Sequence, residues 1–168
     1  MSPSQALPDH RATDRDAFLW QQNLLRTAAR ARENAYAPSS RFRVGAALLC
    51  EDGQIFTGCN IENAAYSPTN CAERTAFFKA VSEGKRRFRA IAVVGGSEEL
   101  NALCPPCGVC RQVVAEFCNP DFLLILGTPE APSCYTLREI LPLSFSGEAL
   151  KSSPSAPGRS CTPSTADT

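Results

Sequence analysis

The first half of the chain has a pattern of apolar and polar positions that predicts one helix followed by a pair of strands. Apolar side chains recur at near-helical spacing from Asp14 to about Asn34, among glutamines and arginines, which predicts an amphipathic helix. A continuous apolar run from Val44 to Cys50 predicts a buried strand, and Ile55 to Cys59 predicts the strand that returns beside it. Asp52-Gly53 favours a tight hairpin turn between them, because glycine adopts a positive φ at little cost.

The second half of the chain alternates predicted helices with predicted strands. The stretch from Asn60 to Asn70 is polar, contains Pro68 and has no period, so it predicts a loop. Helices are expected at Cys71–Glu83, Cys107–Phe117 and Thr136–Leu141, and strands at Ala90–Val94 and Phe122–Leu126. This alternation implies an α/β fold class, and the antiparallel hairpin makes the sheet mixed. We therefore expect a three-layer α/β/α architecture with a mixed sheet of about five strands.

The length, composition and charge of the chain bound its domain organisation and its partners. The 168 residues suffice for one domain, placed at 14–150, between a flexible leader at 1–13 and a disordered, Ser- and Pro-rich tail at 151–168. The 17 basic and 17 acidic residues cancel, so no general attraction to nucleic acid or anionic lipid is expected. No apolar run approaches the ~20 residues of a membrane helix and no secretory signal is visible, which predicts a cytoplasmic protein without a membrane partner.

Cysteines, rather than histidines, dominate the candidate chemistry. The only histidine, His10, lies in the polar leader, which argues against a catalytic triad, a Cys-His dyad or a site with several histidines. An odd number of cysteines without an export signal favours reduced thiols and metal binding over a disulfide framework. The nine cysteines are Cys50, Cys59, Cys71, Cys104, Cys107, Cys110, Cys118, Cys134 and Cys161.

Two short motifs place three cysteines and a glutamate at predicted helix starts. Cys71-Ala72-Glu73 opens one helix, and Pro106-Cys107-Gly108-Val109-Cys110 opens another. Cys107 and Cys110 share one helix face, and the positive end of the helix dipole lowers the pKa of a thiol placed there. Three thiolates can hold a zinc ion and leave its fourth position for water, as in catalytic zinc sites. Beside such an ion, Glu73 can reach the bound water and move protons.

Cys104 competes with Cys110 as the partner of Cys107, because Cys104-Pro105-Pro106-Cys107 has the same spacing. The two prolines force an extended segment, so we expect Cys104 to point away from the metal. If Cys104 were a fourth ligand, the chain would be a non-enzymatic structural zinc module, and Glu73 argues against this alternative. Four others are interpreted as ordinary buried thiols: Cys50, Cys59, Cys118 and Cys134.

These motifs resemble those of the small, homotetrameric, zinc-dependent cytidine deaminases. The resemblance is carried by the segments Cys71–Ala76 and Pro106–Gln112, together with Phe42–Leu48 and Gly58–Ala64, and runs from about Tyr36 to Phe145. It implies hydrolytic deamination of cytidine and 2′-deoxycytidine to uridine and 2′-deoxyuridine with release of ammonia, in pyrimidine salvage. It also implies one zinc ion per chain on Cys71, Cys107 and Cys110, with zinc-bound hydroxide attacking C4 and Glu73 as the proton shuttle.

The resemblance also assigns contacts with the substrate. It implies that Asn60 and Glu62 bind the ribose and that Glu62 accepts a hydrogen bond from the 3′-hydroxyl. It implies that Phe42 packs against the pyrimidine and that the backbone of Ala72 binds the carbonyl of the base. The family often has Tyr at the position of Ser39, and this difference is expected to affect the entrance of the pocket.

Two further residues are assigned by the same resemblance. Phe145 resembles the C-terminal aromatic residue that reaches into a neighbouring subunit's active site, which implies a homotetramer with shared sites. Arg74 is expected to donate hydrogen bonds to the thiolates of Cys107 or Cys110 and so to offset their charge.

Two other kinds of deaminase remain as alternatives. A blasticidin-type enzyme acts on another small aminopyrimidine, and Asn60 and Glu62 argue against it as ribose ligands. An enzyme that edits polynucleotides is disfavoured by the zero net charge and by Cys71, where such enzymes usually carry His. The basic run at 85–89 follows a predicted helix end, where cations are favourable, and is interpreted as solvated surface charge.

Overall fold

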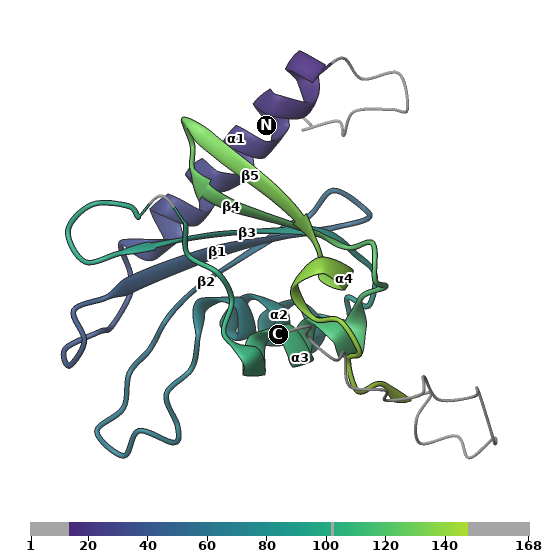
Figure 1. Cartoon of the computed structure of the whole chain (residues 1–168). Helices are drawn as coiled ribbons and strands as arrows, with labels where there is room; N and C mark the ends of the chain where they lie inside the picture. The colour runs from purple at the N-terminus through teal and green to yellow at the C-terminus, as the bar shows by residue number, and fades with distance from the viewer. Residues whose placement is uncertain (1–13, 102, 148–168) are drawn as a thin grey trace, which may run out of the picture.

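A computed structural model shows how these elements assemble (Figure 1). It describes residues 14–101 and 103–147, and the predicted leader at 1–13 and tail at 151–168 lie outside the described residues. Within the described part, one mixed five-stranded sheet carries helices on both of its faces. The expected α/β fold class, with three α/β/α layers, is confirmed.

The sheet has the strand order β2-β1-β3-β4-β5. β3 and β4 pair in parallel, and the other neighbouring strands are antiparallel. Short turns join β1 to β2 and β4 to β5 and allow only antiparallel pairing, whereas the long crossover from β3 to β4 allows a parallel pair. The strands are β1 (Arg43–Cys50), β2 (Ile55–Cys59), β3 (Phe88–Gly96), β4 (Leu123–Thr128) and β5 (Ala131–Thr136).

The helices divide the hydrophobic core into two halves, one on each face of the sheet (Figure 1). On one face, α1 (Asp14–Arg32) buries its apolar stripe against β1, β3 and β4. On the other face, α2 (Ala72–Ser82), α3 (Gly108–Phe117) and the short α4 (Leu137–Ile140) contribute to one core cluster that includes the fully buried Phe77 of α2. None of the described helices has the length and apolar character of a membrane span.

The edge strand β5 is the element whose position the apolar pattern did not predict. Its residues are exposed or half-buried, and Pro132 lies among them. A proline cannot donate a hydrogen bond to a neighbouring strand, so it is tolerated on an edge strand, which is the place that β5 occupies. The strand is defined by its antiparallel pairing with β4, a contact that no local pattern reveals.

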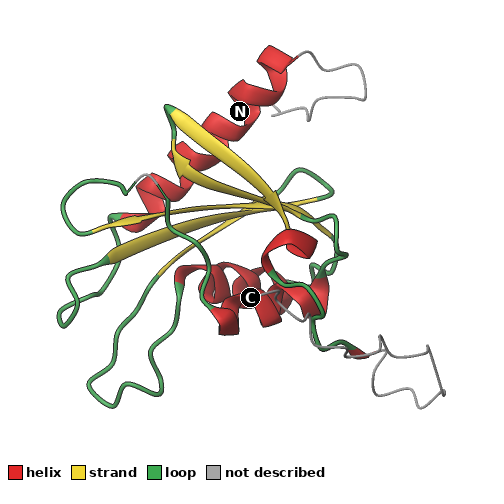
Figure 2. Ribbon diagram, in the orientation of Figure 1, coloured by secondary structure: helices red, strands yellow, loops and turns green. Residues whose placement is uncertain are grey.

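The start of β1 lies next to the end of β2 and the end of β3, because β1 runs antiparallel to both neighbours. These three strand ends form one side of the sheet, which we call this edge below. A long loop at 60–70 leads from β2 to the start of α2 (Figure 2). At this edge Gly58 lies directly under the first turn of α2, and a Cβ atom there would overlap the carbonyl oxygen of Ala72. The absence of a side chain at Gly58 therefore lets α2 begin in close contact with the sheet.

Candidate active site

Three cysteine sulfurs converge where α2 and α3 begin. Cys71 is the residue before α2, Cys107 is the residue before α3, and Cys110 lies within the first turn of α3. The three sulfur atoms lie within 4.8 Å of one another, and those of Cys71 and Cys107 are 3.8 Å apart. Among the described residues this is the one such group of potential metal ligands, and Cys104 is not a member.

The spacing of the sulfurs fits a tetrahedral zinc ion. Zinc–thiolate bonds of about 2.3 Å at tetrahedral angles place two sulfurs about 3.8 Å apart, and the sulfurs of Cys71 and Cys107 have this separation. The N-cap residues of α2 and α3 are Cys71 and Cys107, and neither thiol is used in a side-chain cap hydrogen bond. A zinc ion held by these three sulfurs would keep its fourth position for a reacting molecule.

Hydrogen bonds among these cysteines shift the pKa values of Cys71 and Cys110 in opposite directions. A hydrogen bond from Cys110, supported by one from Arg74, lowers the pKa of Cys71 to about 5, although burial opposes the shift. The same contact with Cys71, together with burial, raises the pKa of Cys110. These contacts favour the thiolate form of Cys71, which is the form that binds metals.

Glu73 is a buried carboxyl group in the first turn of α2. The residue is 4% exposed. Burial raises its pKa to about 6, and the nearby charge of Cys71 acts in the same direction. A carboxyl group with a pKa near neutrality can accept a proton in one step and return it in the next.

Arg74 contacts the three-sulfur group mainly at Cys71, and less strongly at Cys110, one of the two cysteines that were expected. Its Nη2 donates a hydrogen bond to the sulfur of Cys71 at 3.5 Å and another to the carbonyl oxygen of Thr69 at 3.2 Å. Contact with Cys71 is the main cause of the raised pKa of Arg74, and Cys110 contributes less. The reason is local, since Arg74 lies three residues after Cys71 on the same helical face. Its Nε is buried and has no hydrogen-bond partner among the described residues.

The segment that carries the predicted ribose ligands lies beside the metal cluster. Ile61 forms a parallel bridge with Tyr36 and an antiparallel bridge with Asn70, which immediately precedes Cys71. Asn60 and Glu62 flank Ile61, so the structure brings both of them to the edge of the sheet where α2 begins. Hydrogen bonds from Ser40 and Ser39 hold the pKa of Glu62 below its ordinary value, which keeps the carboxylate charged.

Phe42 immediately precedes β1, and its ring lies beside Gly95 near the end of β3. A Cβ atom on Gly95 would lie 3.0 Å from Cε1 of Phe42 and 2.5 Å from the sulfur of Cys104, so both side chains cover this glycine. Burial raises the pKa of Cys104 to about 11, and the charges of Glu73 and Cys71 add to the shift. The raised pKa favours the neutral thiol form of Cys104, which lies beside the Phe42 ring over Gly95.

Ala72 and Phe145 differ in their exposure. Ala72 is the first residue of α2 and is fully buried, and its N–H belongs to the first helical turn, which has no intrahelical acceptor for it. Phe145 is 61% exposed, and its carbonyl oxygen accepts a hydrogen bond of 2.8 Å from Nε2 of Gln112. The Phe145 ring is accessible in the single chain.

Arg111 makes two contacts near the start of α3 that the motifs did not reveal. Its Nε donates to the carbonyl oxygen of Pro106, and its Nη1 donates to that of Ile140, each at 2.8 Å. The side chain therefore ties the residue before Cys107 to the end of α4. The sequence carries no signal for this contact, because Ile140 lies 29 residues away along the chain.

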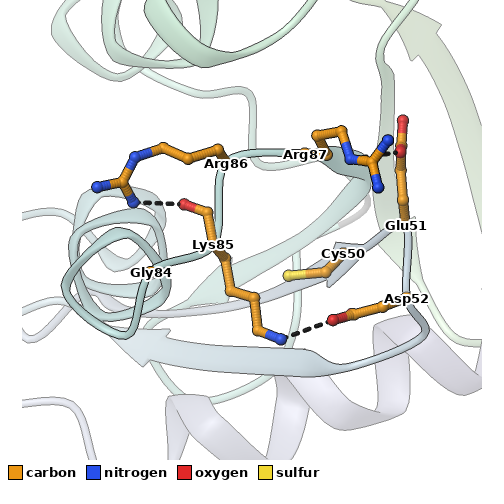
Figure 3. Close-up of a pocket in the computed structure, with 7 residues that line it drawn as sticks. All are labelled: Cys50, Glu51, Asp52, Gly84, Lys85, Arg86 and Arg87. Atoms are coloured by element: carbon orange, nitrogen blue, oxygen red, sulfur yellow. Dashed lines mark hydrogen bonds and ion pairs between the residues drawn. The ribbon is translucent and has the colours of Figure 1, made fainter.

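The basic residues after α2 lie at the opposite end of that helix from the cysteines, where they line a pocket of about 230 Å³ (Figure 3). Lys85 pairs with Asp52 at 2.6 Å, and Arg87 pairs with Glu51 at 3.3 Å. Arg86 donates a hydrogen bond of 2.7 Å to the carbonyl oxygen of Val81, near the helix end. These partners agree with the interpretation of the basic run as surface charge. The pocket is lined by Cys50, Glu51, Asp52, Gly84, Lys85, Arg86 and Arg87.

Comparison with known proteins points to one family. A family model described as the cytidine and deoxycytidylate deaminase zinc-binding region matches residues 19–125, which include all three clustered cysteines and Glu73. A cytidine deaminase of Sporosarcina psychrophila is 56% identical over 133 residues, covering 77% of this chain and 93% of that protein. Another, of Halalkalibacterium halodurans, is 52% identical over 128 residues, covering 76% of this chain and 95% of that protein.

A solved structure gives the same result for the fold. The crystal structure of cytidine deaminase from Burkholderia pseudomallei superposes with a TM-score of 0.68 at 45% sequence identity, covering 73% of this chain and 97% of that one. A blasticidin-S deaminase of Bacillus cereus is more distant, at 31% identity over 111 residues. The comparisons therefore favour the cytidine over the blasticidin alternative.

Proposed function

This chain belongs to the cytidine and deoxycytidylate deaminase family and deaminates cytidine, and on this premise we propose that Glu73 moves the protons of the reaction. Cytidine and water give uridine and ammonia, so one oxygen is added at C4 and one amine leaves. The observation that carries the proposal is the position of the buried Glu73 carboxyl group beside the cluster of three sulfurs.

Glu73 and the three cysteines divide the chemistry between them. Cys71, Cys107 and Cys110 hold the zinc ion, which when bound lowers the pKa of a water molecule enough to supply a nucleophile at neutral pH. Glu73 accepts a proton from the attacking water and delivers it to N3 of the pyrimidine. It then accepts the second proton of that water and passes it to the departing amine, which leaves as ammonia.

We propose that 2′-deoxycytidine is a second substrate. In this proposal Glu62 accepts a hydrogen bond from the 3′-hydroxyl and Asn60 lies beside it, so both contacts persist when the 2′-hydroxyl is missing. Phe42 packs against the pyrimidine, and the N–H of Ala72 donates to the carbonyl oxygen of the base. The burial of Ala72 and the hydrogen bonds among Phe42, Asn60 and the Glu62 segment support this arrangement.

A substrate panel tests the proposed function. Loss of absorbance and release of ammonia are measured with cytidine, 2′-deoxycytidine and blasticidin S, and zinc is determined in the same sample. We expect turnover of both nucleosides, little turnover of blasticidin S and about one zinc ion per chain. Full zinc content without release of ammonia from any of these compounds would exclude the enzymatic function.

Replacing Arg74 with Gln is expected to weaken zinc retention and to lower kcat. Three thiolates on one zinc ion have a formal charge of −1, which Arg74 offsets through its contact with Cys71. Residues that contact metal ligands typically change metal affinity or activity by about 10–100-fold. Arg74→Lys should restore part of the loss, because an ammonium group cannot reproduce the planar guanidinium. The measurements are zinc release to a chelator and kcat for cytidine.

The control for Arg74 is Arg86→Gln, since Arg86 lies at the other end of α2 and contacts carbonyl oxygens there. It should match the wild type in both measurements. If Arg74→Gln also matches the wild type, the two helix dipoles suffice to offset the charge and the argument for Arg74 is wrong.

We propose a homotetramer in which subunits share active sites. Large apolar side chains are exposed on the helices that flank the cluster and on the C-terminal segment, and a single chain leaves them in water. The group includes Phe78 on α2, Val109 on α3, Leu143 and Phe145, which are 47%, 59%, 103% and 61% exposed. Their position supports an interface that places Phe145 against a neighbouring subunit.

Phe145→Ala is expected to raise the KM for cytidine. An aromatic contact contributes about 0.5–1.5 kcal/mol beyond its buried area, which corresponds to a rise of roughly 2- to 12-fold. Phe18→Ala, on the exposed side of α1, serves as the control and should leave the KM unchanged. Mixed oligomers of Phe145→Ala and an inactive Glu73 variant should regain some wild-type sites. A fully active monomer in analytical ultracentrifugation would contradict the shared site.

We also propose a cytoplasmic location and a role in pyrimidine salvage. Eight cysteines lie in the described part of the chain and all are free thiols, which suits a reducing compartment. The zero net charge supports a small-molecule substrate rather than a nucleic acid. The deaminase domain is proposed to span residues 14–150.

A further inference from the structure

We propose that Asn60 and Glu62 are positioning residues for Phe42, so that binding of the ribose and packing of the base are coupled through one hydrogen-bonded segment. The segment comprises residues 39–44 and enters β1 from the loop that follows α1. The inference rests on the proposed contacts of Phe42 with the pyrimidine and of Asn60 and Glu62 with the ribose.

The side-chain amide of Asn60 holds the backbone on both sides of the first residue of β1. Its Nδ2 donates to the carbonyl oxygen of Phe42 at 2.9 Å, and its Oδ1 accepts from the N–H of Val44 at 2.8 Å. The backbone N–H of Asn60 also donates to the carbonyl oxygen of Val44 at 3.2 Å. The half-buried Asn60 side chain thus holds the main chain of Phe42 through its Nδ2 and that of Val44 through its Oδ1.

The carboxylate of Glu62 holds the turn that precedes Phe42. It accepts from the N–H of Ser39 at 2.7 Å and from the N–H of Ser40 at 3.3 Å. The hydroxyl oxygen of Ser40 in turn accepts from the N–H of Phe42 at 3.0 Å. Arg41, between them, has a φ of 56°, a left-handed conformation that side chains with a Cβ atom rarely adopt. This turn therefore needs the contacts that Glu62 supplies.

The ring of Phe42 is confined on its other side by β3. Its Cε1 lies against Gly95, where an added Cβ atom would come within 3.0 Å of it. Asn60 and Glu62 therefore hold the backbone that carries the ring, and Gly95 lies against the ring itself. A ribose hydroxyl that binds Glu62 or Asn60 would order the same contacts that hold Phe42.

If ribose binding and base packing are coupled through this segment, a substitution at Asn60 should weaken the binding of a base that has no sugar. The probes are pyrimidin-2-one and its ribonucleoside, with dissociation constants measured by NMR titration of the zinc-loaded protein, which needs no turnover. We expect Asn60→Leu to weaken the sugar-free base about tenfold and the ribonucleoside by at least as much. Asn63→Ala is the matched control, since Asn63 is exposed in the same loop and, among the described residues, its side chain accepts a local hydrogen bond from the N–H of Ala65.

A second variant protects the test against loss of folding. Asn60→Asp keeps an oxygen to accept from Val44 and removes the donor to Phe42, so it should also weaken the sugar-free base. For Asn60→Leu and Asn60→Asp alike, a cooperative thermal unfolding transition and a full zinc content show that the variant is folded. If the folded variant binds the sugar-free base as wild type does, within about twofold, and only the ribonucleoside is weakened, the coupling is overturned.

A double-mutant cycle separates the coupling from the proposed contact of Phe42 with the base. Phe42→Leu should weaken the sugar-free base, and in that background the Asn60 variant should have little further effect, because it acts through the Phe42 ring. Additive effects of the two substitutions overturn the coupling while the Phe42 contact stands. If Phe42→Leu leaves base binding unchanged, both the contact and the coupling are wrong.

Discussion

Replacing Glu73 with Gln is expected to remove nearly all cytidine turnover while the chain still folds and binds zinc. The amide has the shape of the carboxylate, but it cannot accept the proton of water. General acid–base groups contribute on the order of 10²–10⁴-fold to rate, and Glu73 serves several proton transfers, so we expect a loss at or above the upper end. The burial of Glu73 and its raised pKa of about 6 suit a proton carrier.

Three measurements check the Glu73 prediction: kcat from the loss of cytidine absorbance, zinc content, and the thermal unfolding midpoint. Glu83→Gln is the matched control, because Glu83 is an exposed carboxyl group at the other end of α2. It should retain wild-type turnover. Activity of Glu73→Gln within about tenfold of wild type would remove Glu73 from the proton-transfer steps.

The second large effect is expected for Cys110→Ala, which should lose zinc and activity together. Cys110 lies among the three sulfurs that are within 4.8 Å of one another. Without it, two thiols remain, fewer than the three protein ligands of catalytic zinc sites. Zinc content should fall from about one per chain to a small fraction of that value, and turnover should fall with it.

Cys104→Ala is the control for this prediction. Cys104 lies outside the sulfur cluster, among residues that pack against the core, and burial keeps its thiol neutral. The variant should keep its zinc and its turnover. If Cys104→Ala loses zinc and Cys110→Ala retains it, the ligand assignment is wrong.

The amino-acid sequence by itself determined the strands β1 and β2 and the helix starts that carry the clustered cysteines. The apolar runs of β1 and β2 are local patterns, so the prediction of Ile55–Cys59 matches the strand and that of Val44–Cys50 differs by one residue. The helix starts after Cys71 and Cys107 were equally local, because proline, glycine and apolar spacing mark them. The choice of Cys110 over Cys104 followed from the extended conformation that two prolines impose.

Only the tertiary structure decided which distant residues meet. Cys71 and Cys107 are 36 positions apart, and their sulfurs come together because two separate helices begin at one edge of the sheet. β5 exists through its pairing with β4, since its own residues have no apolar pattern.

Hydrogen-bond partners were the least predictable feature, because one residue type can bond many backbone groups. The sequence predicted that Asn60 is a polar residue in a loop. In the fold, its side chain forms hydrogen bonds with the backbone of Phe42 and Val44. Local patterns specify where elements begin and end, and packing between elements specifies the contacts that perform the chemistry.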